Sequence, residues 1–169
     1  AERAGNGQRA ACDSPGLGMS GGETLGARLA LRAGGLGIEL VCQADPSSGH
    51  AALAPDALQQ VLLNLTLNAL GATPSGGEDR VRAYEPAVAK GRWVELTVED
   101  SGPGIPEEAR EHVFEAFTSS RGERPGGLGL AISKRLVEGA GGRIEIGEAP
   151  GGGARLTVRL PGTGGPGAV

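Results

Sequence analysis

The sequence predicts an α+β fold of two layers, with helices packed against one face of a mixed, mostly antiparallel sheet. Stretches with the apolar spacing of a helix alternate with short runs rich in Val, Ile and Leu, and the later runs form pairs joined by turn residues. Only four of the 169 residues are aromatic, so the core must consist of the Leu, Val, Ile and Ala that recur between residues 53 and 160.

The chain divides into one domain flanked by two tails. Residues 1–22 and 161–169 are rich in Gly and lack sustained periodicity, so we expect linkers or tails there and a single domain over residues 23–160. Inside the domain, the first expected elements are a helix over residues 24–32 and a strand over residues 37–43.

The strongest helix signal covers residues 55–70. Pro55 suits the first turn of a helix, and apolar side chains recur at helical spacing. They are Leu58, Val61, Leu62, Leu65 and Ala69. The later expected elements are all bounded by Gly or Pro. They are a hairpin of strands 80–85 and 92–99, helices starting at Pro106 and covering 128–138, and a hairpin of strands 143–148 and 154–160.

Composition excludes several classes of protein. The net charge is -4, and the absence of a Lys/Arg cluster argues against nucleic-acid binding. No apolar run is long enough to span a membrane, so we expect no membrane contact by this chain and a cytoplasmic location, whether or not a parent protein is membrane-anchored. Cys12 and Cys42 are isolated, and we expect free thiols.

A row of polar residues lies on the helix expected over residues 55–70. Asp56, Gln60, Asn64 and Asn68 follow one another at intervals of four and therefore share a face. A solvated polar surface would explain such a row. An amide carbonyl is also a suitable hard-oxygen ligand for Mg²⁺, which takes its other ligands from water and phosphates.

The segment Asp100-Ser101-Gly102-Pro103-Gly104 directly follows an expected strand. A carboxylate there can accept a hydrogen bond from an exocyclic amine such as that of adenine, and the glycines allow backbone to approach a planar ligand. A plain Gly/Pro turn with a capping aspartate is the alternative interpretation.

Two further motifs follow. In Phe114-Glu115-Ala116-Phe117 we expect the aromatic rings to pack in the core. Residues 126–132 form a Gly-rich turn that opens a helix, and free backbone N–H groups at such a helix start can bind phosphate. This turn does not follow a strand and lacks Gly-Lys-Ser/Thr, which argues against a Walker-type loop or a dinucleotide-binding unit.

Taken in order, QVLLNLTLNAL, DSGPGIP, FEAF and GGLGLAIS resemble the N, G1, F and G2 boxes of the histidine-kinase ATPase domain. This family shares its fold with DNA gyrase, chaperone and mismatch-repair ATPases. The resemblance spans roughly residues 23–160 and implies a Bergerat-type ATP-binding fold with ATP and Mg²⁺ as ligands.

The resemblance implies roles for individual residues in binding and catalysis. Asn68 would coordinate Mg²⁺, and Asn64 would assist in the metal and phosphate region. Asp100 would bind the adenine amino group, with Gly102 and Gly104 shaping the pocket.

The remaining implied roles concern the phosphates. Gly127, Leu128 and Gly129 would contact them at the start of the last helix, and residues 118–126 would form an ATP lid. Arg121 stands where many relatives carry lysine, and its guanidinium can still bind phosphate oxygens.

The implied activity is transfer of the γ-phosphoryl group to a histidine on a separate dimerisation domain, with a response regulator downstream. Neither histidine of this chain resembles the acceptor, because His50 lies in a loop and His112 in the helix starting at Pro106. An anti-sigma-factor serine kinase and a nucleotide-binding scaffold remain alternatives. So does a gyrase-type ATPase, although such enzymes carry a glutamate where this chain has Asn64.

Overall fold

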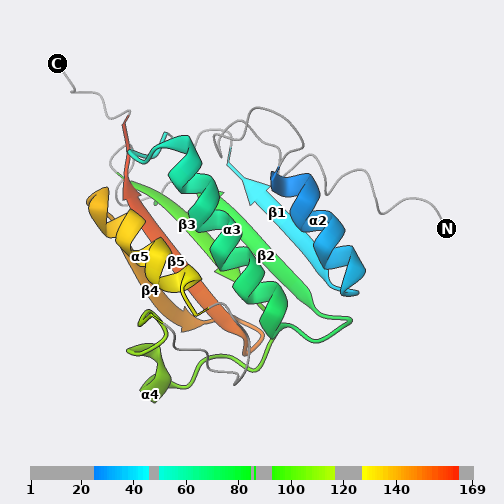
Figure 1. Cartoon of the computed structure of the whole chain (residues 1–169). Helices are drawn as coiled ribbons and strands as arrows, with labels where there is room; N and C mark the ends of the chain where they lie inside the picture. The colour runs from blue at the N-terminus through cyan, green and yellow to red at the C-terminus, as the bar shows by residue number, and fades with distance from the viewer. Residues whose placement is uncertain (1–24, 46–49, 85, 87–92, 117–126, 164–169) are drawn as a thin grey trace.

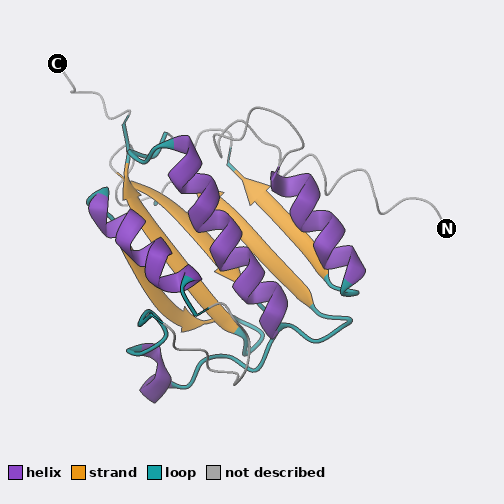
Figure 2. Cartoon of the chain, in the orientation of Figure 1, coloured by secondary structure: helices purple, strands orange, loops and turns teal. Residues whose placement is uncertain are grey.

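The computed structural model of the chain describes residues 25–45, 50–84, 86, 93–116 and 127–163. The helices are α2 Leu25–Gly35, α3 Pro55–Ala72, α4 Glu107–Arg110 and α5 Gly129–Gly139. The strands are β1 Glu39–Ala44, β2 Glu78–Tyr84, β3 Trp93–Glu99, β4 Arg143–Glu148 and β5 Ala154–Pro161. The described residues form two layers, a five-stranded sheet and the helices α2, α3 and α5, which cover one of its faces, while the short α4 lies beside them (Figures 1 and 2).

The sheet has the order β1-β2-β3-β5-β4, and every neighbouring pair except β1 and β2 is antiparallel. Both expected hairpins are present, β2 with β3 and β4 with β5. The α+β prediction of a mixed, mostly antiparallel sheet with helices on one face is therefore confirmed. The expected tail over residues 1–22 lies outside the described residues.

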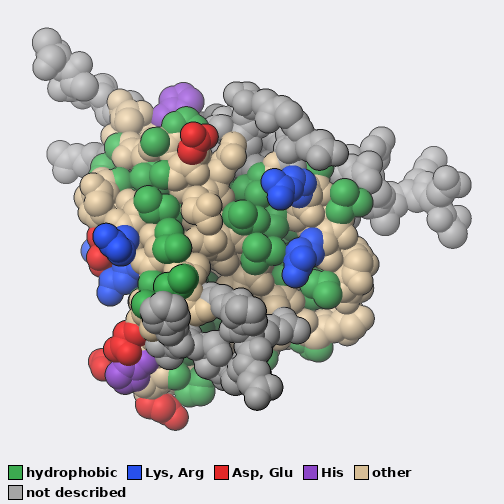
Figure 3. Space-filling view, viewed as in Figure 1, with side chains coloured by type: hydrophobic (Ala, Val, Ile, Leu, Met, Phe, Trp, Pro, Cys, Tyr) green, Lys and Arg blue, Asp and Glu red, His purple; other side chains and the backbone are tan. Residues whose placement is uncertain are grey.

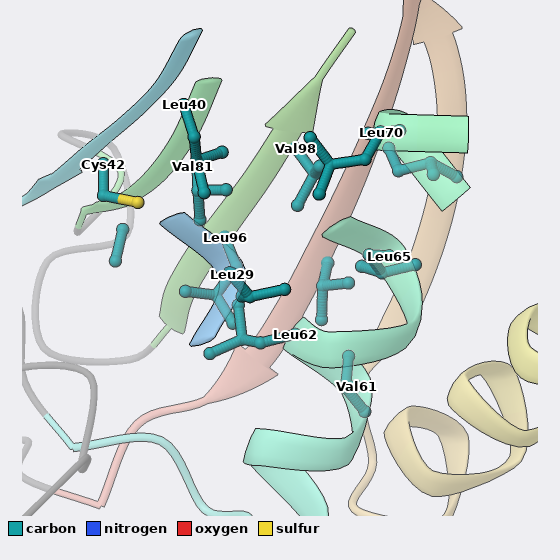
Figure 4. Packing of buried hydrophobic residues seen from close by; sticks show 14 of the residues in the cluster. Leu29, Leu40, Cys42, Val61, Leu62, Leu65, Leu70, Val81, Leu96 and Val98 are labelled. Carbon is teal, nitrogen blue, oxygen red and sulfur yellow. The ribbon is translucent and has the colours of Figure 1, made fainter. Parts of the chain in front are cut away.

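The core lies between the helices and the sheet. Its fully buried side chains come from the middle of α3, from β3 and β5, and from α5, and Figure 4 shows several of them meeting above the central strands. Among them are Val61, Leu65, Val98, Val137 and Val158. Each large aliphatic side chain buried in this way contributes about 1.5–3 kcal/mol to folding. Phe114 packs against this cluster as expected, whereas Phe117 lies outside the described residues.

Cys42 lies on β1 and is buried among core residues (Figure 4). It is disulfide-bonded, so the expectation of a free thiol at this position is wrong. The spacing of cysteines along a chain carries no signal for such a bond, because proximity arises only from the fold. Cys12 lies outside the described residues.

The helix expected from Pro106 is only one turn long. None of the four residues of α4 is buried, and the chain leaves the helix before the first buried side chain, Val113. His112 therefore lies in a turn and not in a helix, which corrects the expectation. It is exposed, and a hydrogen bond between its Nδ1 and Glu115 Oε1 raises the pKa of His112. Figure 3 shows acidic side chains gathered at the lower corner of this face of the molecule.

The outer face of the sheet carries a charged cluster that continues across three strands. Glu95 on β3 accepts hydrogen bonds from the Tyr84 hydroxyl on β2 and from Arg159 Nε on β5, the latter at 2.6 Å. Burial acts to raise the pKa of Glu95, but these two hydrogen bonds outweigh it and the pKa is lowered.

None of the described helices is long and apolar enough to cross a membrane.

Tyr84 should titrate far outside the usual tyrosine range. Burial, together with the hydrogen bond to Glu95 and its negative charge, raises the pKa of Tyr84 to about 12. Because the chain has a single tyrosine, the near-ultraviolet absorbance of its phenolate measures this pKa directly. The resulting stabilisation is complete below the unfolded pKa of 10.0 and is lost as the pH rises through the folded value.

Glu95→Gln should lower the Tyr84 pKa, whereas Glu145→Gln, which removes a carboxylate 3.5 Å from Arg159, should lower it far less. Circular dichroism recorded in parallel separates titration from unfolding. A wild-type midpoint at the ordinary tyrosine value, with the sheet intact, would show that the hydrogen bond to Glu95 does not form in solution.

Candidate functional site

Asp100 directly follows β3 and is almost completely buried. Its Oδ1 accepts hydrogen bonds from the backbone N–H of Gly102 at 2.9 Å and of Ala154 at 3.1 Å. The Asp100 N–H in turn donates to the Ala154 carbonyl at 3.0 Å. The carboxylate is thereby held by its own turn and by the start of β5. Within the described part of the chain, its Oδ2 is left free to accept a hydrogen bond from a ligand.

The glycines around Asp100 are required by close backbone contacts. A Cβ atom at Gly102 would lie 2.7 Å from the Ala72 carbonyl oxygen, and one at Gly153 would lie 1.8 Å from that of Asp100. Gly104 has a φ of +80°, a conformation that favours glycine. The turn after β3 is thus enclosed between the end of α3 and the β4–β5 turn. Gly102 and Gly104 therefore allow the close packing of this turn, at the position where the sequence predicts that they shape a pocket.

Sequence reasoning missed Gly153 and Ala154 as parts of this arrangement. The run Gly151-Gly152-Gly153 was interpreted only as a hairpin turn, because a glycine run is the usual sequence of one. Asp79 and Thr73 were missed as well. Thr73 Oγ1 donates to Asp79 Oδ1 at 2.5 Å in the buried space beside Asp100.

Asn64 joins α3 to the start of α5. Its Nδ2 donates to the Gly129 carbonyl at 3.0 Å and to Ser133 Oγ at 3.2 Å. Its Oδ1 accepts a hydrogen bond from Gln60 Nε2 at 2.8 Å. In this structure both ends of the Asn64 amide are therefore occupied by contacts within the protein, and these contacts hold the N-terminal end of α5 against the middle of α3.

Asn68 lies one turn further along α3 and is exposed. Its side chain forms no hydrogen bond with the described residues, so its amide oxygen is accessible to a ligand. The described residues also hold no group of three or more His, Cys, Asp or Glu side chains that could bind a metal ion. A single amide oxygen fits Mg²⁺ that takes its remaining ligands from phosphate and water.

The N-terminal end of α5 has the features of a phosphate site. The helix starts at Gly129 after Leu128, which makes no side-chain capping hydrogen bond, so the first N–H groups of the helix have no side-chain partner there. Gly127 precedes it in a turn. Residues 118–126, expected to form the lid, lie outside the described residues, and so does Arg121.

These features converge at one end of the domain. The end of α3, the turn after β3 and the start of α5 lie along the lower edge of the view in Figure 1. Residues 54–164 match the family model described as histidine kinase-, DNA gyrase B-, and HSP90-like ATPase. The chain belongs to this ATPase family.

Several proteins similar to this ATPase domain are sensor histidine kinases. TmoS of Ectopseudomonas mendocina is 42% identical over 110 residues, which are 61% of this chain and 11% of that protein. The histidine kinase/phosphatase NtrB of Escherichia coli O157:H7 is 38% identical over 131 residues, 73% of this chain and 37% of that protein. The chain therefore spans well under half the length of these relatives.

Solved structures agree with this assignment. The mycobacterial sensor histidine kinase MprB superposes with a TM-score of 0.67 at 32% identity, covering 82% of this chain and 91% of that one. Full-length ShkA in complex with AMPPNP gives a TM-score of 0.70 at 31% identity, covering 86% of this chain and 30% of that one. The described unit is thus an ATPase domain of the histidine-kinase type, with the Bergerat fold expected from its sequence motifs.

Contacts between the motifs hold this ATPase domain together at the site. The N box meets the G2 box through Asn64 and Gly129, and the G1 turn meets the last hairpin through Asp100 and Ala154. The F box meets α5 through a cation–π contact, with Lys134 Nζ 5.4 Å from the centre of the Phe114 ring. The N box and the F box therefore both contact α5, whereas the G1 turn is held by the last hairpin.

Proposed function

We propose that this domain binds Mg²⁺ and ATP and serves as the catalytic domain of a sensor histidine kinase. It donates the γ-phosphoryl group to a histidine on a separate dimerisation domain, from which a response regulator receives it. The observation that carries the proposal is the convergence of the Asp100 carboxylate, the accessible Asn68 amide and the uncapped start of α5 at one end of the domain.

Binding is divided between two groups of residues. Asp100 accepts a hydrogen bond from the adenine amino group through Oδ2, while its Oδ1 remains bound to the Gly102 and Ala154 amides. Gly102 and Gly104 keep the turn close to the base.

The phosphates lie against Gly127, Leu128 and Gly129, where the N-terminal end of the helix dipole favours negative charge. Arg121, in the lid, adds a further cation.

Asn68 supplies the protein ligand to Mg²⁺, and bound Mg²⁺ offsets the charge of the phosphate oxygens. Asn64 holds the start of α5 in place through Gly129 and Ser133, which positions the phosphate-binding N–H groups. Because the domain positions the nucleotide and supplies no nucleophile, the attacking imidazole belongs to the partner domain.

The environment of Asn64 supports a kinase over a hydrolytic ATPase. A water-activating base would stand one helical turn before the metal-binding amide, and this chain has a neutral amide there. That amide cannot accept a proton from water, and it already donates to Gly129 and Ser133. We therefore infer that the isolated chain hydrolyses ATP slowly. We also infer a cytoplasmic location, where ATP is available.

Phosphotransfer to a dimerisation domain supplied in trans tests this function. With γ-labelled ATP, the chain should place acid-labile phosphate on the histidine of that partner. Asn68→Ala should abolish the labelling because it removes the metal ligand, and the exposed position should leave the fold intact. Asp56→Ala, on the same row of α3 but about 18 Å away along the helix, is the matched control and should label normally.

Phosphate release by the chain alone is measured in the same assay. Rapid release without a partner, at a rate matching or exceeding transfer, would favour the hydrolytic ATPase instead. Unchanged labelling by Asn68→Ala would remove Asn68 from the metal site.

A further inference from the structure

Asp79 is a fully buried carboxyl group that the proposed mechanism does not use. It is the second residue of β2 and shares the helix-facing side of the sheet with Val81 and Ala83, both core residues. On β1 its partner in the sheet is the buried Leu40. On β3 the pairing of Arg80 with Glu99 places Asp79 beside Asp100, one position beyond the ladder.

The side chain of Asp79 connects two parts of the site. Its Oδ1 accepts a hydrogen bond from Thr73 Oγ1 at 2.5 Å, directly after α3. The backbone N–H of Ser101, inside the turn that carries Asp100, also donates to the Asp79 carboxyl group. Its Oδ2 has no hydrogen-bond partner among the described residues. Asp79 thus lies beneath the G1 turn and ties it to the end of α3.

Two neighbouring carboxyl groups that are both buried cannot both be charged at low cost, because each charge loses its hydration and repels the other. Burial raises the pKa of Asp79, and the neighbouring charge of Asp100 raises it further, against the hydrogen bonds from Thr73 and Ser101, which lower it. The other side chains around it, Leu40 from β1 and Thr73 from the end of α3, are uncharged. Adjacent Glu78 is half-buried and pairs with Arg80. Asp79 therefore holds its proton more tightly than an ordinary aspartate does.

We propose that Asp79 is a positioning residue for nucleotide recognition, which stays neutral beside Asp100 and holds the G1 turn against the end of α3. The neutral acid leaves Asp100 as the one negative charge at this position, in the form that accepts the adenine amine. This inference rests on the proposed role of Asp100. Loss of the proton from Asp79 to solvent places a second charge beneath the turn and weakens nucleotide binding.

The free energy of unfolding should also depend on the protonation of Asp79. The folded chain retains a proton on Asp79 that the unfolded chain loses above the unfolded pKa of 3.8. The free energy of unfolding therefore falls as the pH rises from that value through the raised folded pKa, and then levels off. Asp79→Asn carries no titrating group. It keeps a carbonyl to accept from Thr73, and it mimics the protonated form.

Calorimetric titration of ADP into the full chain, from about pH 4 to about pH 9, tests the proposal. Wild-type affinity should fall by about tenfold or more relative to Asp79→Asn as Asp79 loses its proton, which corresponds to one unit of coupled pKa shift. The ionisation of ADP itself is common to both proteins and cancels in the ratio. Thr73→Val removes a hydrogen bond that favours ionised Asp79, so it should move the fall to higher pH.

Glu78→Gln is the matched control, since it removes a carboxylate at the adjacent position and should leave the wild-type pH profile unchanged. A constant ratio of wild-type to Asp79→Asn affinity across the pH range would overturn the proposal. A carboxyl-carbon NMR titration of the nucleotide-free chain gives an independent reading. Asp79 titrating at or below its ordinary pKa would also overturn the proposal, even where ADP binds normally. Failure of ADP to bind any variant would instead reject the proposed function, and the NMR titration would still decide the protonation of Asp79.

Discussion

Replacing Asp100 by asparagine should weaken ADP binding by about a hundredfold or more while the chain stays folded. The asparagine carbonyl can still accept from the Gly102 and Ala154 amides, which occupy Oδ1 in the wild type. The amide nitrogen then takes the place of Oδ2 and presents a donor to the donor of adenine. Losing a charge-assisted hydrogen bond and leaving a buried donor unpaired accounts for a loss of this size.

A fluorescent adenine nucleotide, titrated into wild type and Asp100→Asn with ADP and GTP as competitors, measures the effect. Asp56→Asn removes an exposed carboxylate on α3 and should bind like the wild type. Thermal unfolding separates a binding defect from a folding defect. The assignment of Asp100 as the adenine-binding group would be contradicted if Asp100→Asn bound the nucleotide as tightly as the wild type does. Displacement of the probe by GTP as effectively as by ADP would also contradict it.

Gly153→Ala should disrupt both stability and binding, although position 153 lies about fifty residues after the G1 box. The added methyl group would lie 1.8 Å from the Asp100 carbonyl oxygen and 2.8 Å from its Oδ1, so the hairpin turn and the G1 turn must separate. Overpacking of this kind costs about 1–3 kcal/mol of stability. ADP affinity should fall as well, because the Ala154 amide moves away from Asp100.

Gly151→Ala is the matched control for this substitution. It adds the same methyl group two residues earlier in the same turn, at a position where a Cβ atom meets nothing within 4 Å. Chemical unfolding and ADP titration of the two variants should therefore differ clearly. Equal stability of the two proteins would mean that the β4–β5 turn does not pack on Asp100 in solution.

Sequence reasoning was most successful where the signal is local. The helix expected over residues 55–70 is α3, and the last hairpin occurs where turn residues separate two apolar runs. The parallel pairing of β1 with β2 was not expected, because their connection through α3 gives no local sign of strand direction. The prediction that His112 lies in a helix was wrong. None of the residues of α4 is buried, so no packing against the core extends this helix as far as His112.

The candidate site was predicted unevenly. Asp100 and the amides of α3 could be proposed as site residues because they belong to contiguous motifs. The contacts made by Asp79, Thr73 and Gly153 were not, because each depends on strand register or on the packing of two turns that lie far apart in the chain. Asn64 was expected beside metal and phosphate. Its hydrogen bonds to Gly129 and Ser133 add a role in joining two helices that no sequence pattern indicates.

The hydrogen bond between Ala154 and Asp100 also determines when, during synthesis, the chain becomes able to bind nucleotide in the proposed way. A ribosome that has released residues 25–116 has already made α3 and the G1 turn, but the amide that holds Asp100 Oδ1 has not yet emerged. In the proposed mode of binding, the nascent chain must wait for the start of β5 before its adenine pocket is complete. Nucleotide therefore cannot act as an early ligand that guides folding of the first half, and it instead stabilises a domain whose last hairpin is already in place.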